Sequence, residues 1–300
     1  MQQATVVALP TRKATISAYI NLMKPHVTVL LLGTTLAAMA IAANGFPALG
    51  LTIATLLGGA MAAGSANAIN CYWDRDIDQV MSRTRTRSLP SGKVADTHAL
   101  MFGVSLGAGS FLVLSVFVNL LAALLALSAI FFYVFVYTMW LKRTTPQNIV
   151  IGGAAGAVPV LVGWAAVTHT VGLTAVLMFV IIFMWTPPHF WALSLVLKKD
   201  YARAGVPMMP VVRGDGETVR QIIIYTVALI ATSLALWFTH AMGIIYLVSA
   251  LALGGVLLGY AIRLAKTRSL AHARAMFWIS NNYLALIFAM MVVDRVFRIG

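Results

Sequence analysis

Residues 67–93, NAINCYWDRDIDQVMSRTRTRSLPSGK, place three aspartates, four arginines and a lysine directly after an apolar run. Asn70, Asp74 and Asp78 are spaced four apart, so on a continuing helix they lie along one face, one turn above the next. Two carboxylates one turn apart at a membrane boundary are costly unless a cation lies between them. Mg²⁺ suits such a position because it binds a few carboxylates and leaves other positions to water and phosphate oxygens. The spacing alone fits a charged helix cap equally well, and Asp76, off this face, is expected to pair with an arginine.

The composition is that of a polytopic membrane protein. Of the 300 residues, 61% are hydrophobic and 10% are charged, and the mean hydropathy is +0.90. About a quarter of the residues of a soluble domain are charged. The single cysteine, Cys71, excludes an internal disulfide and a cysteine-based metal cluster.

Apolar windows recur along the whole chain, and each is close to the roughly 20 residues that a membrane-crossing helix needs. They predict an all-α bundle of nine transmembrane helices in one membrane-embedded domain over residues 1–300, with a cavity that opens to the cytoplasm. The first window follows a cytoplasmic segment, 1–24, and is expected to be an uncleaved helix rather than a signal peptide. The nine windows are about 27–43, 49–70, 98–118, 121–140, 150–168, 173–196, 221–239, 243–262 and 276–297.

The charged residues lie almost entirely in one set of loops. Nineteen of the 21 Lys and Arg fall in the N-terminal segment or in alternate connections, and only Arg295 and Arg298 lie beyond the last window. By the positive-inside rule the N-terminus is cytoplasmic and the C-terminus is outside. The formal net charge of +13 therefore reflects topology and anion binding, and nucleic acid is not expected as a partner. An N-terminus without an Arg- and Ser-rich transit segment favours a bacterial plasma (inner) membrane.

A second polar loop follows the sixth window. It begins with Leu197-Lys198-Lys199-Asp200-Tyr201 and continues into a Pro- and Met-rich stretch that ends at Arg213. This loop and residues 67–93 are expected on the same face of the membrane, which suggests two halves of one pocket. The alternative is that each loop is only a solvated connector.

The spacing of Asn70, Asp74 and Asp78, followed by Arg83-Thr84-x-x-Arg87 and Gly92, resembles the signature of the UbiA-type intramembrane prenyltransferases. Within that superfamily the chain is most similar to the protohaem IX farnesyltransferase (haem O synthase) branch. Three further stretches carry this resemblance: TPQNIVIGGAAGAVPVLVGWAA at 145–166, WTPPHFWAL at 185–193 and DYARAGVPMMPVV at 200–212. Many superfamily members carry a second Asp-x-x-x-Asp after helix six. Here Asp200 is preceded by lysines and followed by Tyr201, which fits the haem branch and leaves the number of Mg²⁺ ions open.

The resemblance implies a diphosphate site at the cytoplasmic mouth. Asp74 and Asp78 would hold Mg²⁺, with Asn70 as an oxygen ligand or an orienting neighbour. Metal and basic residues would stabilise the charge on the leaving diphosphate of farnesyl diphosphate. Two of the basic residues, Arg83 and Arg87, lie one turn apart if the helix persists. The residues expected at the diphosphate are Arg83, Arg87, Lys142, Arg143, Lys198, Lys199, Asp200 and Tyr201.

The resemblance also implies haem B as the acceptor. Its vinyl group would attack the farnesyl cation, and water would then complete haem O. His189 lies after Pro187-Pro188 inside the sixth window, and ionisable groups within a membrane are candidates for functional sites. His189, His26 and Trp185 are the residues expected to contact haem, and a histidine that only packs in the core is the alternative for His189.

Two alternatives remain at this point. One is a UbiA-type enzyme that prenylates an aromatic or quinone ring, and the other, from a different class, is a membrane haem carrier or transporter. Besides the lipid bilayer, a haem A synthase or the assembly of a terminal oxidase is a candidate partner for haem hand-over.

Overall fold

The structure, a computed structural model, describes residues 12–297, which fold into helices without any strand. Within this range nine spans are long and apolar enough to cross a membrane, so the predicted all-α bundle of nine spans is confirmed. They are α2 (Pro25–Ala42), α3 (Leu49–Trp73), α5 (Asp96–Phe117), the α6–η1–α7 span (Leu120–Thr144), α8 (Asn148–Thr168), α9 (Leu173–Val196), α12 (Gly214–Trp237), α13 (Ile244–Thr267) and α14 (Leu270–Val296). Of the predicted terminal segments, residues 1–11 and 298–300 lie outside the described range.

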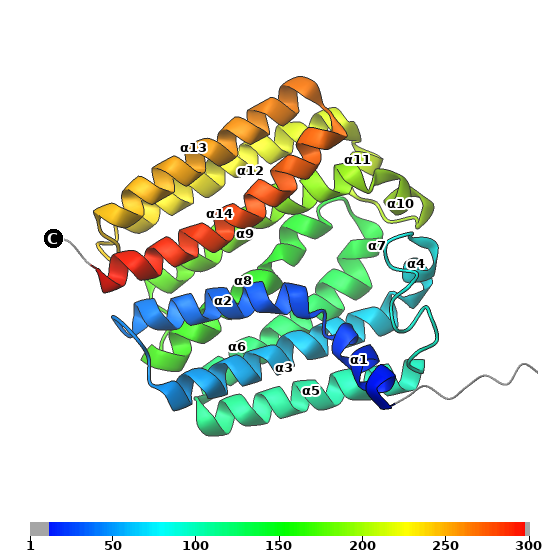
Figure 1. Ribbon diagram of the computed structural model, residues 1–300, viewed down its shortest axis with the longest axis horizontal. Coiled ribbons are helices and arrows are strands. Elements are labelled where there is room, and N and C mark those ends of the chain that lie inside the picture. Colours follow the sequence, from blue (N-terminus) through cyan, green and yellow to red (C-terminus); the bar gives the residue numbers. More distant parts are fainter. Residues whose placement is uncertain (1–11, 298–300) are drawn as a thin grey trace, which may run out of the picture.

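Short helices occupy one end of the bundle (Figure 1). They are α1 (Arg12–Leu22), α4 (Arg75–Val80), α10 (Lys198–Arg203) and α11 (Met209–Val212). The fourth span changes its winding on the way to the same end: α6 (Leu120–Phe131) passes into a π-helix, η1 (Phe132–Leu141), and then into α7 (Lys142–Thr144). Short π-helical stretches often lie at functional sites.

Two groups of helices pack side by side, and the pair α2 and α8 joins them. α3, α5 and α6 form one group, and α9, α12, α13 and α14 form the other (Figure 1). α8 packs on α2, α6 and α9, so it contacts both groups. At its crossing with α2, a Cβ added to Gly163 would lie 2.3 Å from the Thr35 carbonyl oxygen. Only glycine permits this approach, as is common where membrane helices touch.

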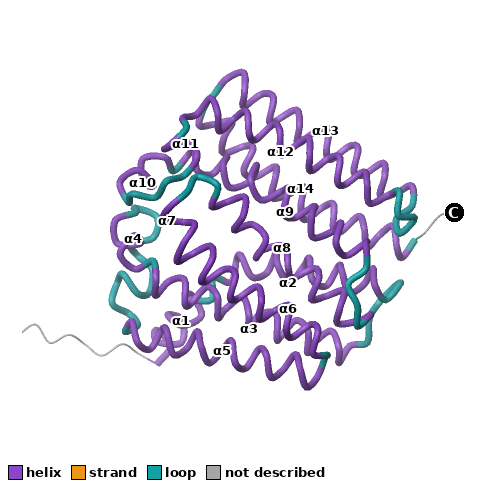
Figure 2. Tube along the Cα trace, turned by 180° about the vertical axis from the view of Figure 1, so that it is seen from behind, coloured by secondary structure: helices purple, strands orange, loops and turns teal. Residues whose placement is uncertain are grey.

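Many large apolar side chains point away from the bundle. Val116, Phe117, Val248 and Trp278 are all more than half exposed, although they lie on spans that also have buried faces. So many exposed large apolar side chains on membrane-length helices suit contact with lipid. The loops that join the spans gather at the two ends of the bundle, as Figure 2 shows.

Two of the predicted spacings depended on a continuous helix, which the structure does not have. The helix through Asn70 does not run straight on to Asp78, because α3 ends at Trp73 and α4 begins at Arg75. Arg83 and Arg87 are not one helical turn apart, since α4 ends at Val80 and turns follow. α9 contains Pro187 and Pro188 and continues through them to Val196.

Candidate active site

The two predicted polar loops meet at the end of the bundle that carries α4, α7 and α10 (Figure 1). Most of the Lys and Arg residues lie at this end, which is called the basic end below. Ser82, in the loop after α4, donates a hydrogen bond to Asp200 Oδ2 at the start of α10. The positive charge of Arg83 lies close enough to Tyr201 to lower the pKa of its phenol, against the larger effect of burial. Segments more than 100 residues apart in sequence therefore form one polar region.

Asp74 lies at the bend between α3 and α4. Its φ and ψ are −88° and 8°, a sparsely populated backbone region often used in active sites. The backbone bonds still follow helical spacing, because Asp74 N–H donates to the Asn70 carbonyl at 2.9 Å and Asp78 N–H to the Asp74 carbonyl at 2.8 Å. The chain bends at Asp74 and changes the direction of the aspartate side chains, while these backbone hydrogen bonds are kept.

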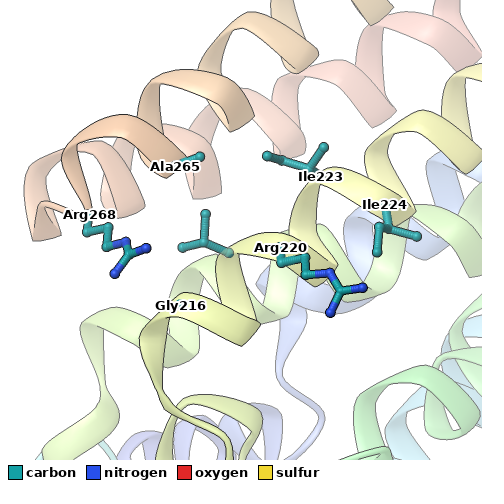
Figure 3. A pocket seen from close by; sticks show the side chains of 7 residues that line it. Gly216, Arg220, Ile223, Ile224, Ala265 and Arg268 are labelled. Carbon is teal, nitrogen blue, oxygen red and sulfur yellow. The ribbon is translucent and has the colours of Figure 1, made fainter.

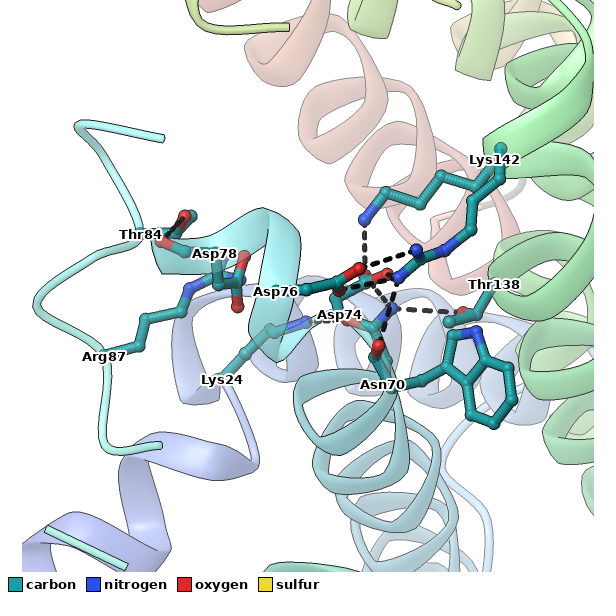
Figure 4. A network of polar contacts seen from close by, with 11 residues as sticks. Lys24, Asn70, Asp74, Asp76, Asp78, Thr84, Arg87, Thr138 and Lys142 are labelled. Carbon is teal, nitrogen blue, oxygen red and sulfur yellow. Dashed lines mark hydrogen bonds and ion pairs between the residues drawn. The ribbon is translucent and has the colours of Figure 1, made fainter. Parts of the chain in front are cut away.

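Asn70 connects three elements through its side-chain amide (Figure 4). Its Nδ2 donates to Asp74 Oδ2 at 2.7 Å and to Thr138 Oγ1, on η1, at 3.1 Å. Its Oδ1 accepts from Lys24 Nζ, just before α2, at 2.7 Å. These contacts fix the orientation of the amide, and burial lowers the pKa of Lys24.

Asp74 is buried between cations. Its side chain is 1% exposed, and Oδ2 accepts from Lys142 as well as from Asn70. Oδ1 has no hydrogen-bond partner, and Arg143 Nη2 forms an ion pair with it at 3.7 Å. A buried carboxylate oxygen without a hydrogen-bond partner is uncommon in a folded protein, which makes it a candidate ligand atom.

Asp78 is equally buried and is held by one arginine. Arg87 Nη1 donates to both carboxylate oxygens of Asp78, at 3.0 and 2.8 Å. Burial alone would lower the pKa of Arg87, but the charge and hydrogen bonds of Asp78, together with smaller effects of Cys71 and Tyr133, leave the pKa above its usual value. Thr84 Oγ1 donates to the Asp78 backbone carbonyl at 3.0 Å and ties the loop after α4 to this residue.

Asp76 forms the predicted arginine pair on the outer side of α4. Both of its oxygens accept from Arg143, each at 2.8 Å. This paired hydrogen bonding lowers the pKa of Asp76 to about 2. Arg143 thus holds Asp76 while its Nη2 remains near Asp74.

Asn70, Asp74 and Asp78, with the cations that contact them, form what is called the acidic centre below. The second polar loop, after α9, contributes less to this centre than the sequence predicts. Hydrogen bonds from Ser82, and a further bond from Arg203, hold the pKa of Asp200 below its usual value. Burial raises the pKa of Tyr201. Lys198 instead pairs with Asp215 of α12 at 2.7 Å, and Lys199 is exposed.

His189 lies between two aromatic rings on α9 and α14. Its ring stacks on Trp185 at 4.3 Å and on Phe277 at 4.5 Å between centroids. Its Nδ1 lies 2.9 Å from Ser280 Oγ, which donates its single hydrogen to the Phe277 carbonyl at 2.8 Å. A carbonyl can only accept, so Nδ1 must donate and Nε2 is left as the acceptor or ligand atom.

Trp185 shares this arrangement, because its Nε1 donates to the Ser280 backbone carbonyl at 2.6 Å. His26, the other predicted haem contact, is exposed at the start of α2 near the basic end. The structure thus joins His189 to Trp185 and leaves His26 apart from them.

A family model for the UbiA prenyltransferase family matches residues 31–285. The chain belongs to the UbiA prenyltransferase family. It is a multi-pass membrane protein, in keeping with its nine apolar spans.

Relatives within the UbiA family share one name. The chain is 53% identical over 291 residues to "Protoheme IX farnesyltransferase" of Gloeobacter violaceus, covering 97% of this chain and 95% of that protein. It is 50% identical over 290 residues to a protein of the same name from a Roseiflexus species, covering 97% of this chain but only 54% of that longer protein.

Solved structures of UbiA-type proteins share the fold. A digeranylgeranylglyceryl phosphate synthase superposes with a TM-score of 0.78 at 18% identity, covering 94% of this chain and 99% of that one. A UbiA homologue from Archaeoglobus fulgidus, bound to DMAPP and Mg²⁺, superposes with a TM-score of 0.67 at 16% identity, covering 92% and 99%.

The residues at the bend fit a divalent cation. Asp74, Asp78 and Asn70 offer buried oxygen atoms, and Oδ1 of Asp74 lacks a hydrogen-bond partner. Hard cations such as Mg²⁺ prefer this type of ligand. Among the described residues no group of three or more His, Cys, Asp or Glu is placed to hold a metal, so the amide oxygen and ligands from outside the chain would complete the set.

Sequence reasoning missed several members of the centre. Lys24 contacts Asn70 from just before α2, and Thr138 contacts it from η1. Ser82 contacts Asp200. The signal for Lys24 was its position next to Pro25 at the basic end of a span, but neither hydroxyl residue stands out in an apolar or polar pattern.

Proposed function

We propose that this protein transfers the farnesyl group of farnesyl diphosphate to a vinyl group of haem B, with addition of water, to give haem O and diphosphate. The name shared by relatives about 50% identical over almost the whole chain carries this proposal. The geometry at the α3–α4 bend supports it, because that site suits an anionic substrate.

The charge balance favours binding of a diphosphate. Lys142 and Arg143 pair with Asp74, Arg87 pairs with Asp78, and Lys24 contacts Asn70 beside them. Arg143 also pairs with Asp76, so four cations face three carboxylates. Guanidinium and ammonium groups bind phosphate oxygens strongly where water is partly excluded. The surplus positive charge would hold the diphosphate, and the farnesyl chain would extend among the apolar spans.

Asp74, Asp78 and Asn70 would hold Mg²⁺, which when bound supplies positive charge to the departing diphosphate. Lys142 and Arg87 contact the same carboxylates and would turn toward the phosphate oxygens. Arg83, near Tyr201, and Arg143, near Asp74, would make further contacts with the diphosphate. Such preorganised charges stabilise the negative charge that develops as the allylic C–O bond breaks.

The overall reaction adds a farnesyl group and a hydroxyl group across the double bond of one vinyl group. The C–O bond between farnesyl and diphosphate breaks, and the leaving diphosphate keeps the electron pair. The terminal vinyl carbon forms a C–C bond with the farnesyl carbon. Water then bonds to the carbon next to the porphyrin and loses a proton, which leaves a hydroxyethylfarnesyl group.

The haem would enter with its propionates near the basic end, where anions cost least. His189 lies seven residues before the end of α9, roughly 10 Å along the helix axis from that end. Its Nε2 has the lone pair needed to bind iron or to accept a proton from the attacking water. We favour iron binding, with Trp185 supporting the ring.

We further propose that the basic end faces the cytoplasm of a bacterial cell, as the positive-inside rule requires. The N-terminus would then be cytoplasmic, and the far end of α14, opposite α1 in Figure 1, would face outside. The chain would act as one domain whose cavity opens to the cytoplasm. A haem A synthase or an oxidase assembly factor would take the product.

The test is a reconstitution. Purified protein is incubated with haem B, farnesyl diphosphate and Mg²⁺, and the extracted haem is analysed by mass. We expect a haem heavier by one farnesyl and one hydroxyl group, formed only when all three additions are present. A protein that prenylates a quinone precursor but not haem, or that moves haem without releasing diphosphate, would contradict the proposal.

A further inference from the structure

A second basic site lies away from the acidic centre, in a groove between α12 and α13 (Figure 3). The groove has a volume of about 300 Å³ and lies at the basic end of the bundle, where α12 begins and α13 ends. Among the described residues, none of its side chains forms a hydrogen bond or an ion pair with Asn70, Asp74 or Asp78. It is lined by Gly216, Val219, Arg220, Ile223, Ile224, Ala265 and Arg268.

The wall of the groove is apolar and open to the outside of the bundle. Val219, Ile223 and Ile224 come from one face of α12, and Ala265 comes from the last turns of α13. Ile224 is 47% exposed although it lies on a membrane span. The groove therefore offers a hydrocarbon-like surface to whatever lies beside the protein in the bilayer.

Arg268 is held over the mouth of this groove. It ends α13 in the left-handed backbone region, with φ of 50° and ψ of 26°, where glycine is the usual residue. A Cβ added to Gly216 would lie 3.8 Å from Cζ and both Nη atoms of Arg268, so the guanidinium packs against the glycine backbone. Within residues 12–297 no carboxylate lies within ion-pair distance of it.

Arg220 supplies the second positive charge from α12, as Figure 3 shows. Its only ion pair among the described residues is a 3.4 Å contact with Glu217, whose other oxygen accepts from Gln221 at 2.7 Å. The Arg220 side chain is 72% exposed. Two guanidinium groups thus flank an apolar groove with little compensation from the protein's own carboxylates.

We propose that this groove binds an anionic phospholipid, with Arg220 and Arg268 on the headgroup phosphate and one acyl chain along the apolar wall. Guanidinium groups form paired hydrogen bonds with phosphate oxygens, and basic pockets between membrane helices suit anionic headgroups. A soluble phosphate would satisfy the arginines but would leave the apolar wall unused. A zwitterionic lipid would bring its own cation next to the two guanidinium groups.

The experiment is native mass spectrometry of the full chain in detergent, titrated with phosphatidylglycerol or phosphatidylcholine. The double variant Arg220→Gln/Arg268→Gln removes the two charges of the groove. Its matched control, Arg263→Gln/Arg274→Gln, removes two exposed arginines from α13 and α14 at the same end. A third variant, Ala265→Phe, fills the groove without changing charge. Elution as a single folded species in size-exclusion chromatography is required of each variant.

We expect one phosphatidylglycerol to bind wild type and the Arg263/Arg274 control with similar affinity. The Arg220/Arg268 variant should bind it about 10- to 30-fold more weakly. Ala265→Phe should also weaken binding, which separates a shaped groove from a general surface potential. Equal binding by the two double variants, equal binding of phosphatidylcholine, or displacement of the lipid by inorganic phosphate would each overturn the proposal.

Discussion

Asn70 sets the geometry of the acidic centre, because both atoms of its amide are engaged. Nδ2 contacts Asp74 and Thr138, and Oδ1 contacts Lys24. The carboxylates of Asp74 and Asp78 would be unstable in this buried position without their cationic partners. In the proposed function the same cations would bind phosphate oxygens, so the groups that stabilise the buried carboxylates would also serve the substrate.

Arg87 provides a test of anion binding at the scale of one residue. Arg87→Lys keeps the positive charge beside Asp78 but loses the forked donor geometry. We expect KM for farnesyl diphosphate to rise about tenfold, the effect of losing one charge-assisted contact. The measurement is initial velocity against farnesyl diphosphate at saturating haem B.

The matched control is Arg85→Lys, an exposed arginine on the same segment. It should leave KM unchanged. If the two variants raise KM equally, the segment acts through its overall charge and Arg87 is not a specific contact.

Ser280 tests the role of His189. Ser280→Ala removes the acceptor that keeps the proton on Nδ1, whereas Ser280→Thr retains a hydroxyl. If Nε2 binds haem iron, the alanine variant should shift the absorption spectrum of bound haem B and weaken its binding, and the threonine variant should restore both. Identical haem spectra for wild type, Ser280→Ala and His189→Ala would show that His189 does not bind iron and only packs in the core.

Among the elements, the bend between α3 and α4 was not predictable from spacing. The sequence Asn70-x-x-x-Asp74-x-x-x-Asp78 has helical periodicity, and helical backbone bonds do continue across it. Tertiary contacts to Lys142 and Arg143 act on Asp74 from a span 68 residues away, and local periodicity carries no information about them. The π-helix η1 was not predictable either, because its apolar pattern is the same as that of an ordinary membrane span.

The nine spans themselves could be predicted, because hydrocarbon thickness fixes their length and charge marks their ends. Their boundaries were less accurate at the basic end. α13 runs to Thr267 and α14 begins at Leu270, whereas hydropathy placed these limits near residues 262 and 276. Polar helical turns that emerge from the bilayer lower the hydropathy without ending the helix.

The crossing of α2 and α8 supplies a stability prediction at this scale. Gly163→Ala would bring a methyl group against the Thr35 carbonyl, and overpacking of this kind costs ~1–3 kcal/mol. We expect a lower Tm in a thermal unfolding assay in detergent. Gly156→Ala, on the same helix with nothing within 4 Å of the added carbon, should leave Tm unchanged or raise it. Equal Tm values for the two variants would show that α2 and α8 are not tightly packed at Gly163.

At the scale of the whole molecule, most of the charged side chains lie at one end of the bundle. The nine spans supply an apolar body, and α4, α7 and α10 bring charged side chains together at the basic end (Figure 1). This division matches a substrate with an anionic head and a long apolar tail. It also matches haem, whose propionates and vinyl groups lie on opposite edges.

The most direct test of this account compares Asp74→Asn with Asp96→Asn in the reaction with haem B, farnesyl diphosphate and Mg²⁺ in ¹⁸O-labelled water. Asp96 makes an exposed pair with Arg75, so its variant controls for loss of one negative charge. For wild type and Asp96→Asn we predict haem that carries one farnesyl group and one ¹⁸O atom. For Asp74→Asn we predict a product yield lower by about 100-fold or more, with haem B binding retained. Near wild-type yield from Asp74→Asn, or product without ¹⁸O, would contradict the account.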